Sequence, residues 1–375
     1  MAKKSGDKIL SPAEMKRKFP SSGKASEIYL DADSSLWLPS RILAFNHMIG
    51  GGIPYGKIMD LHGEESAGKS LLSTDFAYTT QALGGKVLWI DAEAAFDPAW
   101  VSNQGVDPDK IEILKDENML EVISDWIKYQ VLYWRSKLVN NEPILIILDS
   151  IANTDTRDNL ETDSQDKKAE MGKRASKVYE LLRARSTYIS KYGAIMIGIN
   201  QLRQKVGAGM FEDPDTVPGG QAMKFYASQR IGLYRGKMVK DKDKNPVGNV
   251  TYMRTKKNKV APPKKNIKGE FYYETYNGML GYNKYLGFLP ILLEKGIVER
   301  KAGKIYYKGE LLCSYKEEDE MPFIRMILKK EKLRANLIRK SGINSVSKMK
   351  EKLGSIKKNL YPVKVKSKDD GQDDE

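Results

Sequence analysis

One short motif constrains the fold of this 375-residue chain more than any other feature. Residues 63–70 read Gly-Glu-Glu-Ser-Ala-Gly-Lys-Ser and match Gly-x-x-x-x-Gly-Lys-Ser/Thr at every fixed position. The apolar segment Lys57–His62 predicts a strand before the motif, and Ser70–Leu83 predicts a helix after it. A loop in this context aims backbone N–H groups and a helix dipole at phosphates, and Lys69 would pair with the β- and γ-phosphates. We expect nucleotide contacts from Gly63, Glu64, Glu65, Ser66, Ala67, Gly68, Lys69 and Ser70.

Two further strand ends would bring carboxylates to the same edge of a sheet. The segment Pro143–Asp149 is apolar up to its final acid, and Lys86–Asp91 is followed two residues later by Glu93. With a phosphate-binding loop next to them, Asp149 and Ser70 are expected to hold Mg²⁺. Glu93 is our candidate for the general base that orients and deprotonates water. The alternative for both carboxylates is an ordinary acid at the end of a strand.

The alternation of strand-like and helix-like segments predicts an α/β fold with a mostly parallel sheet. We expect strands at Lys57–His62, Lys86–Asp91, Ile111–Leu114, Pro143–Asp149 and Ala194–Asn200, and helices at Ser70–Leu83, Met119–Val139 and Gly172–Tyr192. Further strands at Gln229–Arg235, Val250–Asn258 and Gly269–Thr275 lack long helices between them, so the sheet should end antiparallel. Two helices, Leu286–Val298 and Phe323–Lys340, are expected around a hairpin at Lys304–Glu310.

Two long segments lack a regular pattern. Leu202–Gly220 contains four glycines, two prolines, Arg203 and Phe211. This composition suits a loop that grips phosphates and wedges a ring between bases, although a disordered insertion is the alternative. Gln201 directly precedes the loop and could pass a signal to it from the γ-phosphate. Thr154–Met171 is also loop-like but acidic, so the basic helix after it would supply phosphate contacts, or would be a solvated helix face.

The charge distribution favours a polyanionic partner. The chain has a net charge of +14 and a pI near 9.3. Residues 323–368 contain 15 basic and two acidic residues, whereas residues 369–375 carry a net charge of −5. One cysteine and two histidines exclude an intramolecular disulfide and an ordinary zinc site. No apolar run approaches the ~20 residues of a membrane span, and no signal peptide is evident, so we expect an intracellular protein without a membrane partner.

From about Pro39 to Glu310 the chain resembles the RecA-family recombinases of bacteria and phages. The resemblance implies a RecA-like P-loop ATPase core with a mostly parallel central sheet, an N-terminal oligomerisation segment and a small α+β C-terminal domain. The motifs that carry it are Gly63–Ser70, Ile90-Asp91-Ala92-Glu93, Leu148-Asp149-Ser150, Asn200-Gln201-Leu202-Arg203, Met210-Phe211, Gly219–Ser228 and Lys257–Pro262.

The resemblance also assigns roles to individual residues. It implies that Glu93 is the catalytic base and that Gln201 links ATP to the second DNA loop. Asp97 and Trp100 would hold the adenine, although Trp100 taken alone could be a core residue. Lys257 and Lys259 would reach the ATP of a neighbouring protomer, like an arginine finger supplied in trans. DNA contacts are expected from Met171, Gly172, Ser176, Arg203, Phe211, Gly219, Gly220 and Gln221.

The family resemblance predicts four regions. These are an N-terminal oligomerisation segment (1–38, with a helix capped by Ser11), an ATPase core with DNA-binding loops (39–278), a basic C-terminal domain (279–368) and an acidic tail (369–375). The first DNA loop matches the bacterial pattern poorly before Met171, and the helix Met119–Val139 is longer than in bacterial housekeeping members. These departures indicate a divergent member of the family, which a phage could encode.

The expected function is an ATP-dependent filament on single-stranded DNA that pairs it with duplex DNA and exchanges strands. ATP and Mg²⁺ are the expected cofactors. Single-strand-binding and loader proteins are expected partners, in the cytoplasm of a bacterium or of a phage host. The alternatives are a hexameric helicase on the same core, which usually completes its site with an arginine, and a non-catalytic assembly protein, which the intact motifs disfavour.

Overall fold

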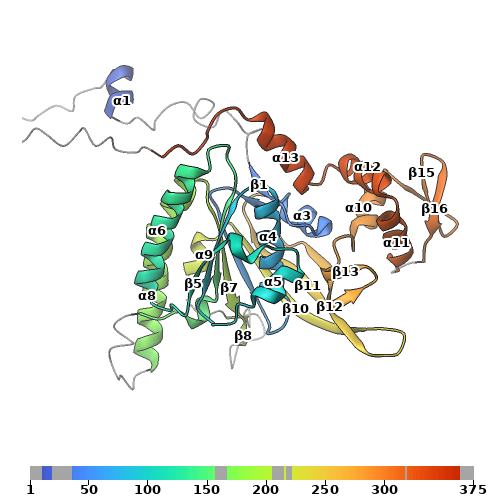
Figure 1. Ribbon diagram of the computed structural model, residues 1–375, viewed down its shortest axis with the longest axis horizontal. Helices are drawn as coiled ribbons and strands as arrows, with labels where there is room; N and C mark the ends of the chain where they lie inside the picture. The colour runs from blue at the N-terminus through green and yellow to red at the C-terminus, as the bar shows by residue number, and fades with distance from the viewer. Residues whose placement is uncertain are drawn as a thin grey trace, which may run out of the picture. The chain divides into compact units, whose positions relative to one another are not determined.

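The computed structural model describes residues 11–18, 36–156, 167–204, 215–216, 222–316 and 319–363 of the chain (Figure 1). The chain divides into two compact units, Met1–Leu36 and Trp37–Glu375. In the first unit, helix α1 spans Pro12–Lys18. Ser11 caps it as expected: its backbone N–H donates to the Glu14 carboxylate at 2.9 Å, and its hydroxyl accepts from the Glu14 N–H at 3.3 Å.

The second unit is built on a nine-stranded sheet with the order β13-β12-β11-β10-β3-β7-β6-β4-β5. Its strands are β3 (Ile58–Gly63), β4 (Lys86–Asp91), β5 (Ile111–Lys115), β6 (Ile144–Asp149), β7 (Ile195–Gln201), β10 (Gln229–Lys240), β11 (Pro246–Asn258), β12 (Asn266–Tyr276) and β13 (Met279–Tyr282). The strands from β10 to β5 pair in parallel, and β10 to β13 pair antiparallel. Both parts of the sheet prediction are confirmed.

Helices cover both faces of the parallel part of the sheet. They include α4 (Lys69–Ala82), α5 (Pro98–Asn103), α6 (Leu120–Lys137), α8 (Lys167–Lys191) and α9 (Ala222–Tyr226). One face, with Leu88, Ile146 and Met196, shares a buried cluster with α6 and α8, which run side by side (Figure 1). Successive strand residues point to opposite faces, and the alternate residues, such as Leu145 and Ile197, are also fully buried. This two-sided burial explains why these strands read as continuous apolar runs.

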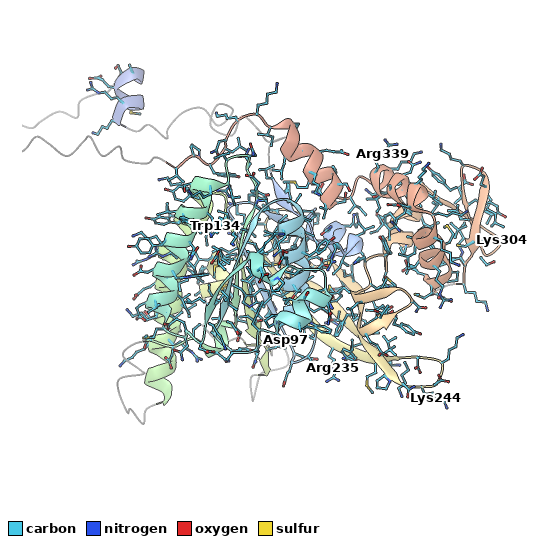
Figure 2. The ribbon with its side chains drawn as sticks, in the orientation of Figure 1. Asp97, Trp134, Arg235, Lys244, Lys304 and Arg339 are labelled. Carbon is cyan, nitrogen blue, oxygen red and sulfur yellow. The ribbon has the colours of Figure 1, made fainter. Side chains whose placement is uncertain are left out.

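The C-terminal part packs around a second apolar cluster that includes Phe288, Ile305, Phe323 and Leu337. Leu43 of α3 (Leu43–Ile49) belongs to the same cluster. The remaining elements are β1 (Trp37–Leu38), β2 (Ile53–Pro54), α10 (Phe288–Glu294), β14 (Glu299–Lys301), β15 (Lys304–Tyr307), β16 (Glu310–Ser314), α11 (Met321–Lys329), α12 (Glu331–Ser341) and α13 (Val346–Ser355). Basic side chains such as Lys304 and Arg339 lie on its surface (Figure 2).

Three details of the sequence prediction are wrong. The single helix expected over Phe323–Lys340 is two helices, because Lys330 has the non-helical angles φ −114° and ψ 76°. Helix α8 begins at Lys167, inside a segment that we expected to be a loop. The segment after Gln201 contains a small ladder of β8 (Arg203–Gln204) with β9 (Asp215–Thr216).

Strands β10 and β11 are longer than predicted and extend to a turn at 241–245, where the Asn245 N–H donates to the Asp241 carboxylate at 2.8 Å. Arg235 and Lys244 mark this ribbon in Figure 2. Across the described ranges, no helix is both long and apolar enough to cross a membrane.

Candidate ATP and DNA site

The phosphate-binding loop connects β3 to α4 as the motif predicted. Gly63 ends the strand and Lys69 begins the helix. A Cβ on Gly63 would lie 2.2 Å from the Leu233 carbonyl oxygen, and one on Gly68 would lie 2.3 Å from the Tyr282 hydroxyl. Gly68 also has a φ of +92°, which favours glycine. Close approach therefore requires both glycines of the motif, and the backbone angle requires the second one as well.

Lys69 and Ser70 lie on a cavity of about 250 Å³ at the carboxyl ends of the parallel strands. The Lys69 ammonium donates to the carbonyl oxygens of Gly63 at 3.1 Å and Glu64 at 2.6 Å. Burial lowers the pKa of Lys69, whereas the negative charges of Asp149 and Glu93 raise it. The ammonium is thus held at the loop by neutral carbonyl groups.

Ser70 and Asp149 offer the oxygen ligands that Mg²⁺ prefers. The Ser70 hydroxyl donates to the Asp149 carboxylate at 2.9 Å. Burial raises the pKa of Asp149 to about 6, with Glu93 and Asp91 adding to the effect. A hydroxyl beside a buried carboxylate, with two more acids nearby, fits a divalent cation that would offset this concentration of negative charge.

Glu93 lies on the same cavity, in a turn that is anchored at both ends. The Asp91 carboxylate accepts hydrogen bonds from the N–H groups of Ala95 and Phe96, each at 3.0 Å. The Ala92 N–H donates to the Asp149 carbonyl at 2.8 Å, so the ends of β4 and β6 are joined directly. The Glu93 carboxylate accepts from the Gln201 amide at 3.3 Å. Gln201 lines the cavity too, so the five motif side chains meet as the strand ends predicted.

Asp97 and Trp100 lie outside the residues that line this cavity. Asp97 is the N-cap of α5, where its carboxylate accepts from the N–H groups of Ala99 at 2.8 Å and Trp100 at 3.1 Å (Figure 2). Both residues are at most half-buried. The Asp97 side chain therefore has a structural role at the start of α5 in addition to any contact with a base.

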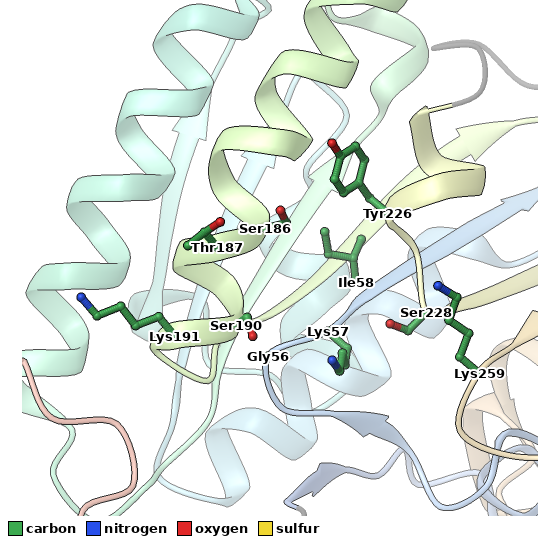
Figure 3. A pocket seen from close by; sticks show the side chains of 10 residues that line it. All are labelled: Gly56, Lys57, Ile58, Ser186, Thr187, Ser190, Lys191, Tyr226, Ser228 and Lys259. Carbon is green, nitrogen blue, oxygen red and sulfur yellow. The ribbon is translucent and has the colours of Figure 1, made fainter. Parts of the chain in front are cut away.

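Lys257 and Lys259 lie near the amino-terminal ends of the parallel strands, whereas the P-loop lies at their carboxyl ends. Lys257 pairs with Arg230, and Asn258 is level with Met59 near the start of β3. Met59 is four residues before Gly63, a separation of roughly 13 Å along the strand. Lys259 lines a cavity of about 590 Å³ at this edge, beside Ser228 (Figure 3). The two lysines thus lie away from the P-loop of their own protomer.

Lys257 is engaged within its own chain. Its ammonium donates to the carbonyl oxygens of Lys224 at 2.5 Å and Phe225 at 3.3 Å, at the end of α9. Burial lowers the pKa of Lys257, and Lys259 and Arg230 lower it further. A lysine at a helix C-terminus stabilises carbonyl groups that have no partner within the helix.

The expected DNA-contacting residues are only partly described. Gly172 and Ser176 are exposed on α8, Met171 lies in the same helix, and Arg203 lies in β8. Phe225 of α9 has an exposed fraction of 67%. The remaining expected contacts lie outside the described residues, namely Phe211, Gly219, Gly220 and Gln221.

The sequence prediction missed the residues that support the P-loop from behind. The Tyr282 hydroxyl donates to the Gly68 carbonyl at 3.1 Å, and the Thr251 hydroxyl donates to the Ala67 carbonyl at 3.1 Å. The Glu64 carboxylate accepts from the backbone N–H of Arg235 at 2.9 Å. These partners are more than 170 residues apart in sequence, so no local pattern could have revealed them.

Comparison with known proteins agrees with this geometry. Residues 21–278 match the model of the RecA N-terminal domain. The chain is 32% identical to Protein RecA of Cereibacter sphaeroides over 84% of this chain and 87% of that protein. It is 34% identical to Protein RecA of Streptomyces avermitilis over 84% of this chain and 77% of that protein, and 35% identical to Protein RecA of a Nocardioides species over 75% of each. The chain belongs to the RecA family.

Membership settles the general function. The protein is a RecA-type recombinase, which binds ATP and DNA, forms filaments and takes part in DNA recombination and repair. It is an ATPase that uses a nucleotide and Mg²⁺ in the general manner of its family. The family prediction from the sequence motifs is therefore confirmed.

Proposed function

We propose that this RecA-family protein polymerises on single-stranded DNA and hydrolyses ATP in a DNA-dependent manner. The filament pairs the bound strand with homologous duplex DNA and exchanges strands. The observation that carries the proposal is the separation of the two sets of site residues. Lys69, Ser70, Glu93, Asp149 and Gln201 gather at one edge of the sheet, whereas Lys257 and Lys259 lie toward the other.

A site divided between two edges is completed only when a second protomer brings its lysines to the first. Such a head-to-tail contact uses different surfaces on the two copies, and it generates a ring or an open helix. A chain that extends along DNA requires the open helix. ATP between protomers then couples assembly to nucleotide state, because the nucleotide is part of the interface.

Each residue of the ATP site has a proposed role. The backbone of Gly63, Glu64, Glu65, Ser66, Ala67 and Gly68 binds phosphate oxygens, and Lys69 pairs with the β- and γ-phosphates. Mg²⁺, held by Ser70 and Asp149, would neutralise charge on the phosphates. Glu93 accepts the proton of the attacking water, and Gln201 senses the γ-phosphate. Asp97 and Trp100 hold the adenine, and Lys257 and Lys259 contact the γ-phosphate of the neighbour.

The DNA is proposed to contact the first turns of α8 and the segment between β7 and α9. The residues are Met171, Gly172, Ser176, Arg203, Phe211, Gly219, Gly220 and Gln221. Phe211 would stack on or wedge between bases, a contact typically worth ~1–3 kcal/mol.

The remaining regions have proposed roles of their own. Residues 1–38 mediate oligomerisation. Residues 279–368 attract duplex DNA by their positive charge. The acidic residues 369–375 compete with DNA phosphates for the lysines of residues 279–368. Single-strand-binding and loader proteins are proposed partners, in a bacterial cytoplasm.

Electron microscopy tests the proposal. The protein is mixed with single-stranded DNA and a non-hydrolysable ATP analogue, with Lys69→Ala as the matched control that lacks the phosphate-binding ammonium. Long helical filaments that require the analogue are the expected result. Closed rings would indicate a helicase-like assembly instead, and particles that never extend along DNA would contradict the proposal.

A further inference from the structure

Ser150 lies next to the reacting groups, and the proposed mechanism does not yet use it. It directly follows Asp149 at the end of β6 and is fully buried, with an exposed fraction of 0%. Its backbone carbonyl accepts the Asn153 N–H at 3.1 Å, within the short 3₁₀ turn Ile151–Asn153. The residue is therefore fixed by its own turn and by the strand that carries the metal-binding carboxylate.

The Ser150 side chain contacts the proposed base. Its hydroxyl donates to the Oε1 atom of the Glu93 carboxylate. The Gln201 amide donates to the same Oε1 atom, at 3.3 Å. Two donors from two different strand ends thus converge on one oxygen of Glu93. The described residues place no hydrogen-bond donor on the other oxygen, Oε2, which leaves it for a water molecule.

The two donors differ in their attachment. Ser150 directly follows the last residue of β6, Asp149, whose carbonyl accepts the Ala92 N–H of the Glu93 turn at 2.8 Å. Gln201 is the last residue of β7, directly before the segment that leads to the second DNA loop. A residue that senses the γ-phosphate must change partners when the nucleotide binds, whereas Ser150 has no such task.

We propose that Ser150 is a positioning residue for Glu93. It holds Oε1 in every nucleotide state, so that Oε2 stays aimed at the attacking water when Gln201 turns toward the γ-phosphate. Without Ser150, the carboxylate depends on Gln201 alone and loses its orientation when Gln201 moves. The inference rests on the proposed role of Glu93 as the base.

The expected effect is on turnover rather than on binding. A misplacement of about 1 Å at a reacting group can cost ~10²-fold in rate. We expect Ser150→Ala to lower kcat for DNA-dependent ATP hydrolysis by about 10- to 100-fold. The KM for ATP and the affinity for single-stranded DNA should stay within about twofold of wild type.

The matched control removes a buried hydroxyl for which the described residues supply no hydrogen-bond partner. Ser73 on α4 is fully buried, and its hydroxyl has no hydrogen-bond partner among the described residues. Ser73→Ala should leave kcat unchanged. Ser150→Cys keeps the size of the side chain but offers a weaker donor, so it should fall between wild type and Ser150→Ala, and it remains informative if the alanine variant folds poorly.

A double-mutant cycle separates a positioning role from a structural one. If Ser150 acts through Glu93, adding Ser150→Ala to Glu93→Gln should not lower single-turnover hydrolysis further. A further loss in the double variant, or a wild-type kcat in Ser150→Ala, would overturn the inference. If Glu93→Gln itself retained full turnover, the proposed base would be wrong, and this outcome is distinct from the failure of Ser150.

Discussion

At the scale of residues, the environment of Glu93 is suited to general-base catalysis. The carboxylate lies on the same cavity as Lys69 and Asp149, and Asp91 fixes the turn that carries it. The P-loop motif and the acids at strand ends predicted this grouping, because the carboxyl ends of parallel strands meet at one edge. Ser150, Thr251 and Tyr282 were not predictable, since their roles depend on contacts between segments far apart in the chain.

The variant Glu93→Gln keeps the shape of the side chain and an acceptor oxygen but removes the carboxylate that we propose as the base. We expect it to bind ATP and to form filaments on single-stranded DNA, and to hydrolyse ATP about 10²–10⁴-fold more slowly. Steady-state turnover with saturating DNA and ATP measures the effect, and filament formation is the control for folding. Turnover within a few-fold of wild type would exclude Glu93 as the base.

At the scale of elements, the long periodic segments were predictable and their breaks were not. The bounds of strands β3 to β7 were predicted to within one residue, because burial of most of these strands on both faces leaves continuous apolar runs. The split between α11 and α12 was missed, since the sequence around Lys330 contains no proline or glycine to mark the break in backbone angles at that residue. Glu320 is half-buried directly before α11, and its carboxylate caps the N-terminus of α10 rather than that of α11.

Glu320 makes the stability of the C-terminal part depend on pH. Its carboxylate accepts from the N–H groups of Gly287 at 3.0 Å and Leu289 at 3.3 Å, at the start of α10. Burial raises its pKa to about 7, from an ordinary value of 4.5; Glu270 raises the pKa further, while the two N–H groups and Lys268 lower it. Because the pKa is raised in the folded state, the stabilising contribution is present below about pH 4.5 and is lost as the pH rises to about 7.

The variant Glu320→Gln should remove this dependence, since an amide oxygen accepts the same hydrogen bonds without titrating. Between pH 5.5 and pH 8, we expect the wild type to lose about 2 kcal/mol of stability relative to Glu320→Gln. Urea unfolding of both full-length proteins at the two pH values provides the measurement, and their difference cancels the titration of all other groups. A constant difference across this range would show that Glu320 titrates at its ordinary pKa.

At the scale of the whole molecule, Lys257 and Lys259 lie too far from the P-loop of their own protomer to complete its ATP site. Strand β11 contains Lys257 and ends one residue before Lys259. It runs antiparallel to β10, so its end lies near the start of β3 and away from the P-loop. The sequence Lys-Lys-Asn-Lys at residues 256–259 drew attention to these lysines, because so many positive charges are uncommon at the end of a strand. Only the register of β11 against β10 shows where the lysines lie relative to the P-loop. A second copy is the natural source of the ATP that these lysines would meet.

Lys257→Ala and Lys259→Ala test this division of the site. Both should abolish DNA-stimulated ATP hydrolysis, while ATP binding by the isolated monomer stays nearly unchanged, because we propose that the lysines act on the nucleotide of a neighbour. Lys304→Ala, which removes an exposed lysine at the start of β15, is the control for loss of a positive charge. A monomer that loses ATP affinity as strongly as the filament does would place the lysines in the ATP site of their own protomer.

The two lysines should differ in one respect, because only Lys257 caps α9 in the protomer. Lys257→Ala should therefore increase amide hydrogen exchange at the end of α9 in the DNA-free monomer, whereas Lys259→Ala should not. Suppose that both variants abolish turnover and that only Lys257→Ala increases exchange in α9. The Lys257 ammonium would then have two roles. When it leaves the end of α9 to contact a neighbour's phosphate, it would also release α9, which follows the proposed second DNA loop. Equal exchange in both variants would leave Lys257 with a role at the interface alone.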